Sequence, residues 1–151
     1  MIKAVLDTNV LAPGVVGFSN SSSTPGQLLR LWQAGAFDLV VSDHILEELA
    51  RTLSAPYFQR HVGPEELTRL KKLLGRRAIR TAITTRVRGI ATHPEDDLVL
   101  AAAVSAKAEY LVTGDEKLQR VGGYRNVAIL SPRAFLNVLR AGPPEESQTE
   151  R

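Results

Sequence analysis

The sequence predicts an α/β fold with a mainly parallel central sheet covered by helices on both faces. Short apolar runs at residues 4–6, 37–41 and 110–113 indicate buried strands, because they are too short for core helices and are followed by polar or turn residues. Longer segments with apolar residues at helical spacing separate these strands. Strands that alternate with helices are typical of a parallel sheet between two helical layers.

The composition is that of an ordinary globular chain. It has 151 residues, of which 44% are hydrophobic and 23% charged, and this length can bury a core without cross-links. The sequence has no Cys, which excludes disulfides, thiolate zinc sites and thiol redox chemistry. No apolar run approaches the roughly 18 residues of a membrane span, and Lys3 leads directly into a strand instead of a secretory signal. We therefore expect no membrane association and a cytoplasmic protein.

The domain boundary is expected near residue 140. Residues 1–140 are interpreted as one domain, with no internal repeat. Residues 141–151 include Gly142, two prolines and mostly polar side chains, a composition that predicts a disordered tail.

The first half of the chain carries several helix signals. Residues 10–17 contain Pro13 and two glycines, so we expect any helix there to be broken. A helix is predicted from Thr24, with Pro at its first position, to Gly35. The next helix begins at Ser42 or Asp43, and Pro56 ends it.

Two acids on that helix compete for one role. Glu47 and Glu48 are adjacent, and neighbours on a helix lie about 100° apart. One of them is therefore expected to face the crevice at the sheet edge while the other faces water.

The next helix, which opens at Gly63-Pro64, is expected to bury a leucine seam of Leu67, Leu70, Leu73 and Leu74. It begins a strongly basic stretch in a chain whose formal net charge is +3. Such a stretch fits a polyanion partner, an acidic protein segment or a solvated helix face. The basic residues are Arg69, Lys71, Lys72, Arg76, Arg77, Arg80, Arg86 and Arg88.

The second half of the chain completes the alternation. Part of residues 78–90 is interpreted as a less central strand, and residues 98–106 as an Ala-rich buried helix with Asp96 and Asp97 in its first turn. A last strand is predicted at 126–130, followed by a helix that Ser131 caps.

Acidic residues follow the strands at one edge of this sheet. The strands 4–6 and 110–113 run into Asp7 and Asp115, and ligands gather where parallel strands end. The helices that begin near Ser42 and Asp96 start at the same edge, so Glu48 and either Asp96 or Asp97 are expected to join the two aspartates.

Such a cluster has a specific chemical consequence. Carboxylates a few ångströms apart repel, unless they share protons or hold a cation. Oxygen ligands suit Mg²⁺, which activates water for hydrolysis of a phosphodiester. Thr8, Asn9 and Thr113 are candidates to orient ligands or waters. The alternative is that each acid only caps a helix or fills a turn.

Four segments together resemble a PIN domain, and more closely the branch of toxins of toxin–antitoxin systems. The resemblance covers about residues 2–139 and implies a three-layer α/β/α sandwich. It further implies an Mg²⁺- or Mn²⁺-dependent endoribonuclease, a homodimer and a cognate antitoxin. The segments are Val5-Leu6-Asp7-Thr8-Asn9-Val10-Leu11, Ser42-Asp43-His44-Ile45-Leu46-Glu47-Glu48-Leu49, Pro94-Glu95-Asp96-Asp97-Leu98-Val99-Leu100-Ala101 and Leu111-Val112-Thr113-Gly114-Asp115.

The resemblance also implies roles for particular residues. Its four acidic metal ligands and catalytic residues fall on Asp7, Glu48, Asp96 and Asp115, with Asp97 a competing ligand because the register can slip by one. Asn9 and Thr113 match supporting polar positions. One departure is His93, which stands where this branch often has Asp.

Other classes fit less well. A phosphotransferase of the haloacid dehalogenase type needs a second Asp where Asn9 stands, and a receiver domain needs its acceptor Asp on a middle strand. His44, His61 and His93 lack metal-ligand spacing. The remaining alternative is a non-catalytic PIN-like module that binds RNA or protein.

Overall fold

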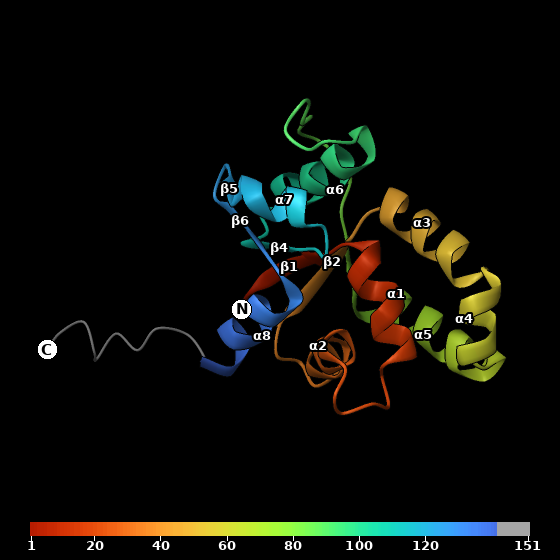
Figure 1. Cartoon of the computed structure of the whole chain (residues 1–151). Helices are drawn as coiled ribbons and strands as arrows, with labels where there is room; N and C mark the ends of the chain where they lie inside the picture. Colours follow the sequence, from red (N-terminus) through yellow and green to blue (C-terminus); the bar gives the residue numbers. More distant parts are fainter. Residues whose placement is uncertain (142–151) are drawn as a thin grey trace, which may run out of the picture.

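The computed structural model describes residues 1–141 and shows a six-stranded sheet in the order β3-β2-β1-β4-β6-β5 (Figure 1). Every pairing is parallel except that of β5 with β6. The predicted mainly parallel sheet is therefore confirmed. The strands are β1 (Lys3–Leu6), β2 (Asp38–Val41), β3 (Ile79–Arg80), β4 (Tyr110–Val112), β5 (Gly123–Tyr124) and β6 (Val127–Leu130).

Helices cover both faces of the sheet, which gives the three-layer α/β/α arrangement. Helix α6 packs on β1, β2 and β4, while α8 packs on β6 and α2 from the other side (Figure 1). Among residues 1–141 no helix has the length and apolarity that crossing a membrane requires. The helices are α1 (Thr8–Val16), α2 (Thr24–Gln33), α3 (Asp43–Leu53), α4 (Pro56–His61), α5 (Pro64–Arg77), α6 (Pro94–Ser105), α7 (Glu116–Val121) and α8 (Pro132–Ala141).

Strand β1 lies at the centre of the core. Its residues Ala4, Val5 and Leu6 have no solvent exposure, because β2 and β4 flank them and helices cover both faces. The chain leaves β1 toward β2 and returns later to β4 on the other side. In an open α/β sheet, such a change of direction leaves a crevice at the carboxyl ends of the strands. Asp7 follows directly at that point.

Helix α1 corrects the prediction of a broken segment at residues 10–17. It runs without interruption through Pro13, although proline removes one backbone hydrogen bond in a helix interior. The side chains of Val10, Leu11 and Val15 are buried, and Gly14 lets α1 approach α2 closely. Tertiary packing therefore outweighs the local cost of proline.

The short elements were the least predictable. Pro56 does not end α3, which stops at Leu53, but instead opens the separate helix α4. Helix α7 and strand β5 were not anticipated. The less central strand within 78–90 is confirmed as β3, which is only two residues long and lies at the sheet edge. The predicted tail at 141–151 lies outside the described residues, apart from Ala141 at the end of α8.

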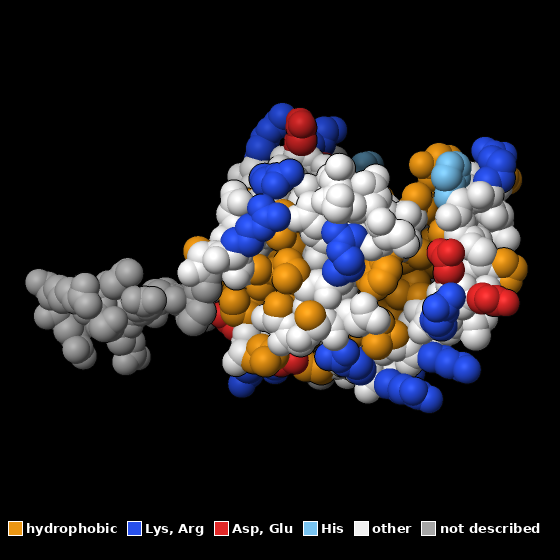
Figure 2. Space-filling model, turned by 90° about the horizontal axis from the view of Figure 1, so that it is seen from below, with side chains coloured by type: hydrophobic (Ala, Val, Ile, Leu, Met, Phe, Trp, Pro, Cys, Tyr) orange, Lys and Arg blue, Asp and Glu red, His pale blue; other side chains and the backbone are white. Residues whose placement is uncertain are grey.

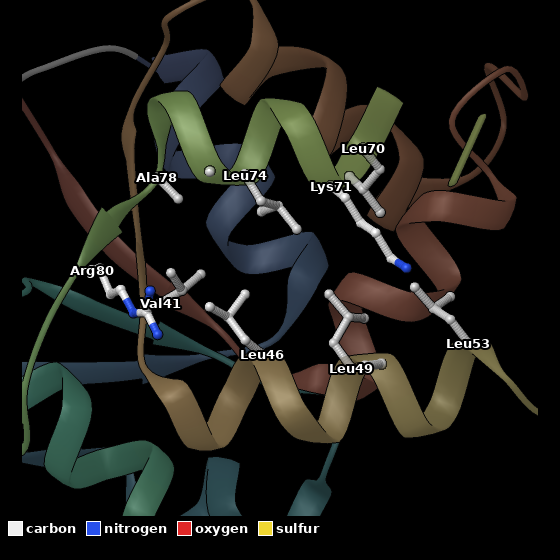
Figure 3. Close-up of a pocket in the computed structure, with 11 residues that line it drawn as sticks. Val41, Leu46, Leu49, Leu53, Leu70, Lys71, Leu74, Ala78 and Arg80 are labelled. Atoms are coloured by element: carbon white, nitrogen blue, oxygen red, sulfur yellow. The ribbon is translucent and has the colours of Figure 1, made fainter. Parts of the chain in front are cut away.

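Helix α5 is less buried than its leucine pattern predicted. Leu74 is buried, whereas Leu67, Leu70 and Leu73 are only partly buried and pack against the core, so full burial of the expected seam holds for Leu74 alone. A cavity of about 270 Å³ separates α5 from α3, with Leu46, Leu49 and Leu53 of α3 facing Leu70 and Leu74 across it (Figure 3).

Candidate active site

The carboxylate of Asp7 lies in a buried position at the end of β1. Only 4% of the residue is exposed, and its Oδ1 accepts a hydrogen bond of 2.7 Å from the Thr8 backbone N–H at the start of α1. The pKa of Asp7 is raised to about 6, mainly by burial and in smaller part by the charges of Asp96 and Glu48. Hydrogen bonds from Thr113 and Thr8 oppose this shift.

Polar side chains at the ends of β1 and β4 form one hydrogen-bond network. The Thr113 hydroxyl donates to Oδ2 of Asp7 at 3.0 Å, and the Asn9 side-chain amide donates to the hydroxyl oxygen of Thr113 at 3.3 Å. The backbone N–H of Gly114 donates to Oδ1 of Asn9 at 2.9 Å. The network fixes the amide of Asn9 and the hydroxyl of Thr113 beside Asp7.

Asp115 is attached to the same network. Its backbone N–H donates to the Thr113 hydroxyl oxygen at 3.1 Å, and its Oδ1 caps α7 by accepting from the Lys117 backbone N–H at 2.9 Å. The helix-cap alternative is therefore correct for one oxygen of Asp115. The other oxygen makes no hydrogen bond within residues 1–141.

Glu48 and Asp96 reach the crevice from two other helices. Burial raises the pKa of Asp96, and the charges of Asp115 and Glu48 add to the effect. Because Glu48 also raises the pKa of Asp7, its charge acts on both aspartates. Glu47 is exposed on α3, whereas Glu48 is half-buried. The second turn of α3 and the first turn of α6 thus bring Glu48 and Asp96 toward Asp7.

Asp97 has a different environment from Asp96. Its carboxylate is buried and accepts three backbone hydrogen bonds, from the N–H groups of Gly89 (2.9 Å), Ile90 (3.2 Å) and Ala91 (2.7 Å). These bonds fasten the loop between β3 and α6 to the first turn of α6. Both oxygens of Asp97 are therefore occupied by the loop.

The family model described as PIN domain matches residues 3–117, which is most of the chain. This chain belongs to the PIN domain family. The family resemblance carried by the four acidic segments is thereby confirmed.

Solved structures support the fold of this PIN domain. It is similar to a chain in the crystal structure of VapBC2 from Rickettsia felis bound to a DNA fragment from their promoter, with a TM-score of 0.56 and 19% sequence identity. The similarity covers 86% of this chain and 98% of that chain. At this identity the comparison establishes a shared fold. Among curated proteins, none matches this chain.

The PIN domain places hard oxygen donors where a divalent cation would be favoured. Burial, and in smaller part the charges of neighbouring carboxylates, raise the pKa values of Asp7 and Asp96, and a bound cation would offset both effects. Within residues 1–141, however, no three acidic or histidine side chains lie close enough together to form a ready-made metal site. The donor chemistry fits Mg²⁺ or Mn²⁺, and binding requires the carboxylates to draw together.

Two histidines beside the acids were not assigned a role from the sequence. His93 precedes the first helical residue of α6, and its charge lowers the pKa of Asp96. On α3, Nε2 of His44 lies 3.2 Å from Oε2 of Glu48. The sequence signal for this second contact is the four-residue spacing, which places both side chains on one helix face.

Part of the basic stretch of the PIN domain borders a groove beside α5. Exposed Arg69, Lys72 and Arg76 of α5 border a groove of about 580 Å³ whose other lining comes from α1, α2 and the loop between them. Val15, Leu29 and Leu73 belong to its apolar lining. On the molecular face shown in Figure 2, hydrophobic side chains lie exposed between Lys and Arg side chains.

Proposed function

We propose that this PIN domain is a metal-dependent endoribonuclease that hydrolyses RNA phosphodiester bonds, and that it acts as the toxin of a toxin–antitoxin pair. The observation that supports catalysis is the convergence of four acids from separate elements on one sheet edge. Burial raises the pKa values of Asp7 and Asp96, and the charges of the neighbouring acids in this group add to the effect. A surface of this protein that only bound RNA would gain nothing from repelling phosphate. The four acids are Asp7, Glu48, Asp96 and Asp115.

These four carboxylates are proposed to hold Mg²⁺ or Mn²⁺. When bound, such a cation lowers the pKa of a water and offsets negative charge on the phosphoryl oxygens. The Thr113 hydroxyl and, at 3.4 Å, the Asn9 side-chain amide both donate to Oδ2 of Asp7, which supports a fixed orientation of this carboxylate. We assign Asp97 to the loop and Asp96 to the cation, because the oxygens of Asp97 already accept three backbone hydrogen bonds.

The basic groove supports a protein partner. An amphipathic helix can bury its apolar face in a hydrophobic groove, and acidic residues beside that face would meet Arg69, Lys72 and Arg76. Within residues 1–141 none of these three cations is paired with a carboxylate. The similar Rickettsia felis structure is a complex named VapBC2 bound to promoter DNA. We propose a cognate antitoxin as the partner of this chain, together with a homodimeric assembly and a cytoplasmic location.

One observation favours the alternative of a non-catalytic PIN-like module that binds RNA or protein. In the described part of the chain the acids do not already form a metal-binding group. A site that never closed around a cation would leave only the binding surfaces.

Cleavage of pooled cellular RNA by the purified protein separates the two functions. The reactions contain Mg²⁺, Mn²⁺ or EDTA, and the wild-type protein is compared with Asp7→Asn. A matched control is Asp38→Asn. Asp38 begins β2 and therefore lies at the amino ends of the parallel strands, opposite the acids at their carboxyl ends. We expect metal-dependent cleavage by the wild type and the control, and none by Asp7→Asn. Bound but uncleaved RNA with either metal would support the alternative, and cleavage by Asp7→Asn would contradict the site assignment.

A further inference from the structure

We infer that His44 is a positioning residue that holds the Glu48 carboxylate in the acidic crevice. This inference rests on the proposed function, because it concerns how a proposed cation ligand is oriented. Nothing in the four acidic motifs requires a histidine at this position. The argument depends instead on a contact between two side chains of α3.

The contact joins residues one helical turn apart. Residues four apart on a helix are neighbours on its surface, and Nε2 of His44 lies 3.2 Å from Oε2 of Glu48. The His44 and Glu48 side chains are 21% and 28% exposed, so water competes only in part for either group.

The His44 ring nitrogen has no other partner. Nε2 is shielded from solvent and makes no hydrogen bond of good geometry within residues 1–141. A buried polar atom without a partner is costly, which favours any small rotation that improves its alignment with a nearby acceptor. The Glu48 carboxylate is that acceptor, with the proton of the imidazole on Nε2.

The first turn of α3 holds His44 in a fixed position beside Glu48. The Ser42 hydroxyl caps the helix by accepting from the Ile45 backbone N–H at 3.2 Å, and Ile45 has no solvent exposure. His44 therefore stands on a rigid first turn. A glutamate side chain has several rotatable bonds, and a free one at the rim of a crevice would turn toward water.

The direction of the Glu48 carboxylate matters to the proposed cation site. Its charge adds to the raised pKa values of both Asp7 and Asp96, which indicates that it lies near both. Groups that hydrogen-bond to a metal-ligating side chain fix its orientation, and their loss typically lowers metal affinity by 10- to 100-fold. His44 is suited to this part because it contacts Glu48 from its own helix.

Three variants test the inference in the full-length protein. His44→Leu removes the ring nitrogen and keeps an apolar body, whereas His44→Gln retains an N–H donor. His61→Leu is the matched control, because the His61 ring bonds the Tyr57 carbonyl on α4 outside the crevice. Each variant is also combined with Glu48→Gln.

The first readout needs no metal and is the NMR order parameter of the Glu48 side chain. We expect His44→Leu to lower it, His44→Gln to restore most of it and His61→Leu to leave it unchanged. An order parameter unchanged in His44→Leu would overturn the inference. This measurement stands even if the proposed nuclease function fails.

The second readout is Mn²⁺ affinity, measured by electron paramagnetic resonance of the free ion. We expect His44→Leu to weaken binding about 10-fold or more. The double variant His44→Leu/Glu48→Gln should bind no more weakly than Glu48→Gln alone, because His44 acts through Glu48. Additive losses would contradict the inference. A wild type that fails to bind Mn²⁺ would refute the proposed metal site, while the order parameter still decides the role of His44.

Discussion

The hydroxyl of Thr113 donates a hydrogen bond of 3.0 Å to the carboxylate of Asp7, across 106 residues of sequence. Both residues are buried at the carboxyl ends of neighbouring strands, β1 and β4. This bond joins the sheet to the candidate active site, because the same hydroxyl oxygen also accepts from Asn9 and from the Asp115 backbone.

Replacing Thr113 with Val should destabilise the protein by about 1–3 kcal/mol, because the buried groups that contact the hydroxyl lose their partner. Valine keeps the shape of threonine without the hydroxyl. Thr113→Ser is the control, because it keeps the hydroxyl and removes only a methyl group. Urea unfolding measures both variants, and a Val variant as stable as the Ser variant would show that the hydroxyl contributes little.

The stability gained by Asp7→Asn should grow with pH. The pKa of Asp7 is raised from 3.8 to about 6 in the folded protein. As the pH rises, the Asp7 carboxyl group therefore ionises at a lower pH in the unfolded chain than in the folded protein, and its ionisation favours unfolding. A difference of about 2 pH units corresponds to about 3 kcal/mol. The advantage of Asn over Asp should therefore be smallest near pH 4 and approach its full size above pH 7.

Urea unfolding in EDTA at pH 4 and pH 7.5 checks this expectation. EDTA removes cations that would favour the ionised form of Asp7. Asp38→Asn at the opposite sheet edge controls for the removal of a carboxylate elsewhere in the protein. A stability difference between Asp7→Asn and the wild type that does not change with pH would contradict the raised pKa of Asp7.

Adjacent aspartates on α6 should respond oppositely to amidation. Asp97→Asn should destabilise the protein by about 2–3 kcal/mol, because hydrogen bonds to a charged acceptor are among the strong ones and the loop at 89–91 depends on them. Asp96→Asn should keep or raise stability at pH 7.5, because the pKa of Asp96 is raised in the folded protein. Thermal unfolding at that pH, with EDTA present, compares them. Equal destabilisation would contradict the division of roles between the two residues.

Replacing two helical glycines with alanine should change the free energy of unfolding in opposite directions. A Cβ at Gly26 of α2 would lie 2.0 Å from the carbonyl oxygen of Gly17, a backbone atom that cannot move aside cheaply. At Gly75 of α5, nothing lies within 4 Å of the added Cβ. We expect Gly26→Ala to cost more than about 2 kcal/mol and Gly75→Ala to stabilise by about 0.5–1 kcal/mol. Urea unfolding of each variant measures the difference, and destabilisation by Gly75→Ala would show that α5 does not tolerate a standard helix former there.

Much of the architecture could be predicted because its causes are local in the sequence. The apolar run Ala4-Val5-Leu6 indicates a strand that is buried on both faces, and the polar residue Asp7 that follows it marks the end of this strand. The caps at Ser42 and Ser131 likewise depend on a side chain and a backbone N–H three residues away. Residue type and spacing alone therefore determined the alternating fold class and the edge of the sheet where acids gather.

Other features depend on neighbours that only the folded chain brings together. Packing against α2 keeps α1 continuous through Pro13, and the three N–H groups of a neighbouring loop distinguish Asp97 from Asp96. The leucine spacing of α5 predicted a buried face, but Leu70 lines the cavity between α5 and α3 and is only partly buried. The sequence by itself determined which residues are suited to a core or to a metal site. Tertiary structure decided which of them meet, because burial and hydrogen bonding depend on segments far apart in the chain.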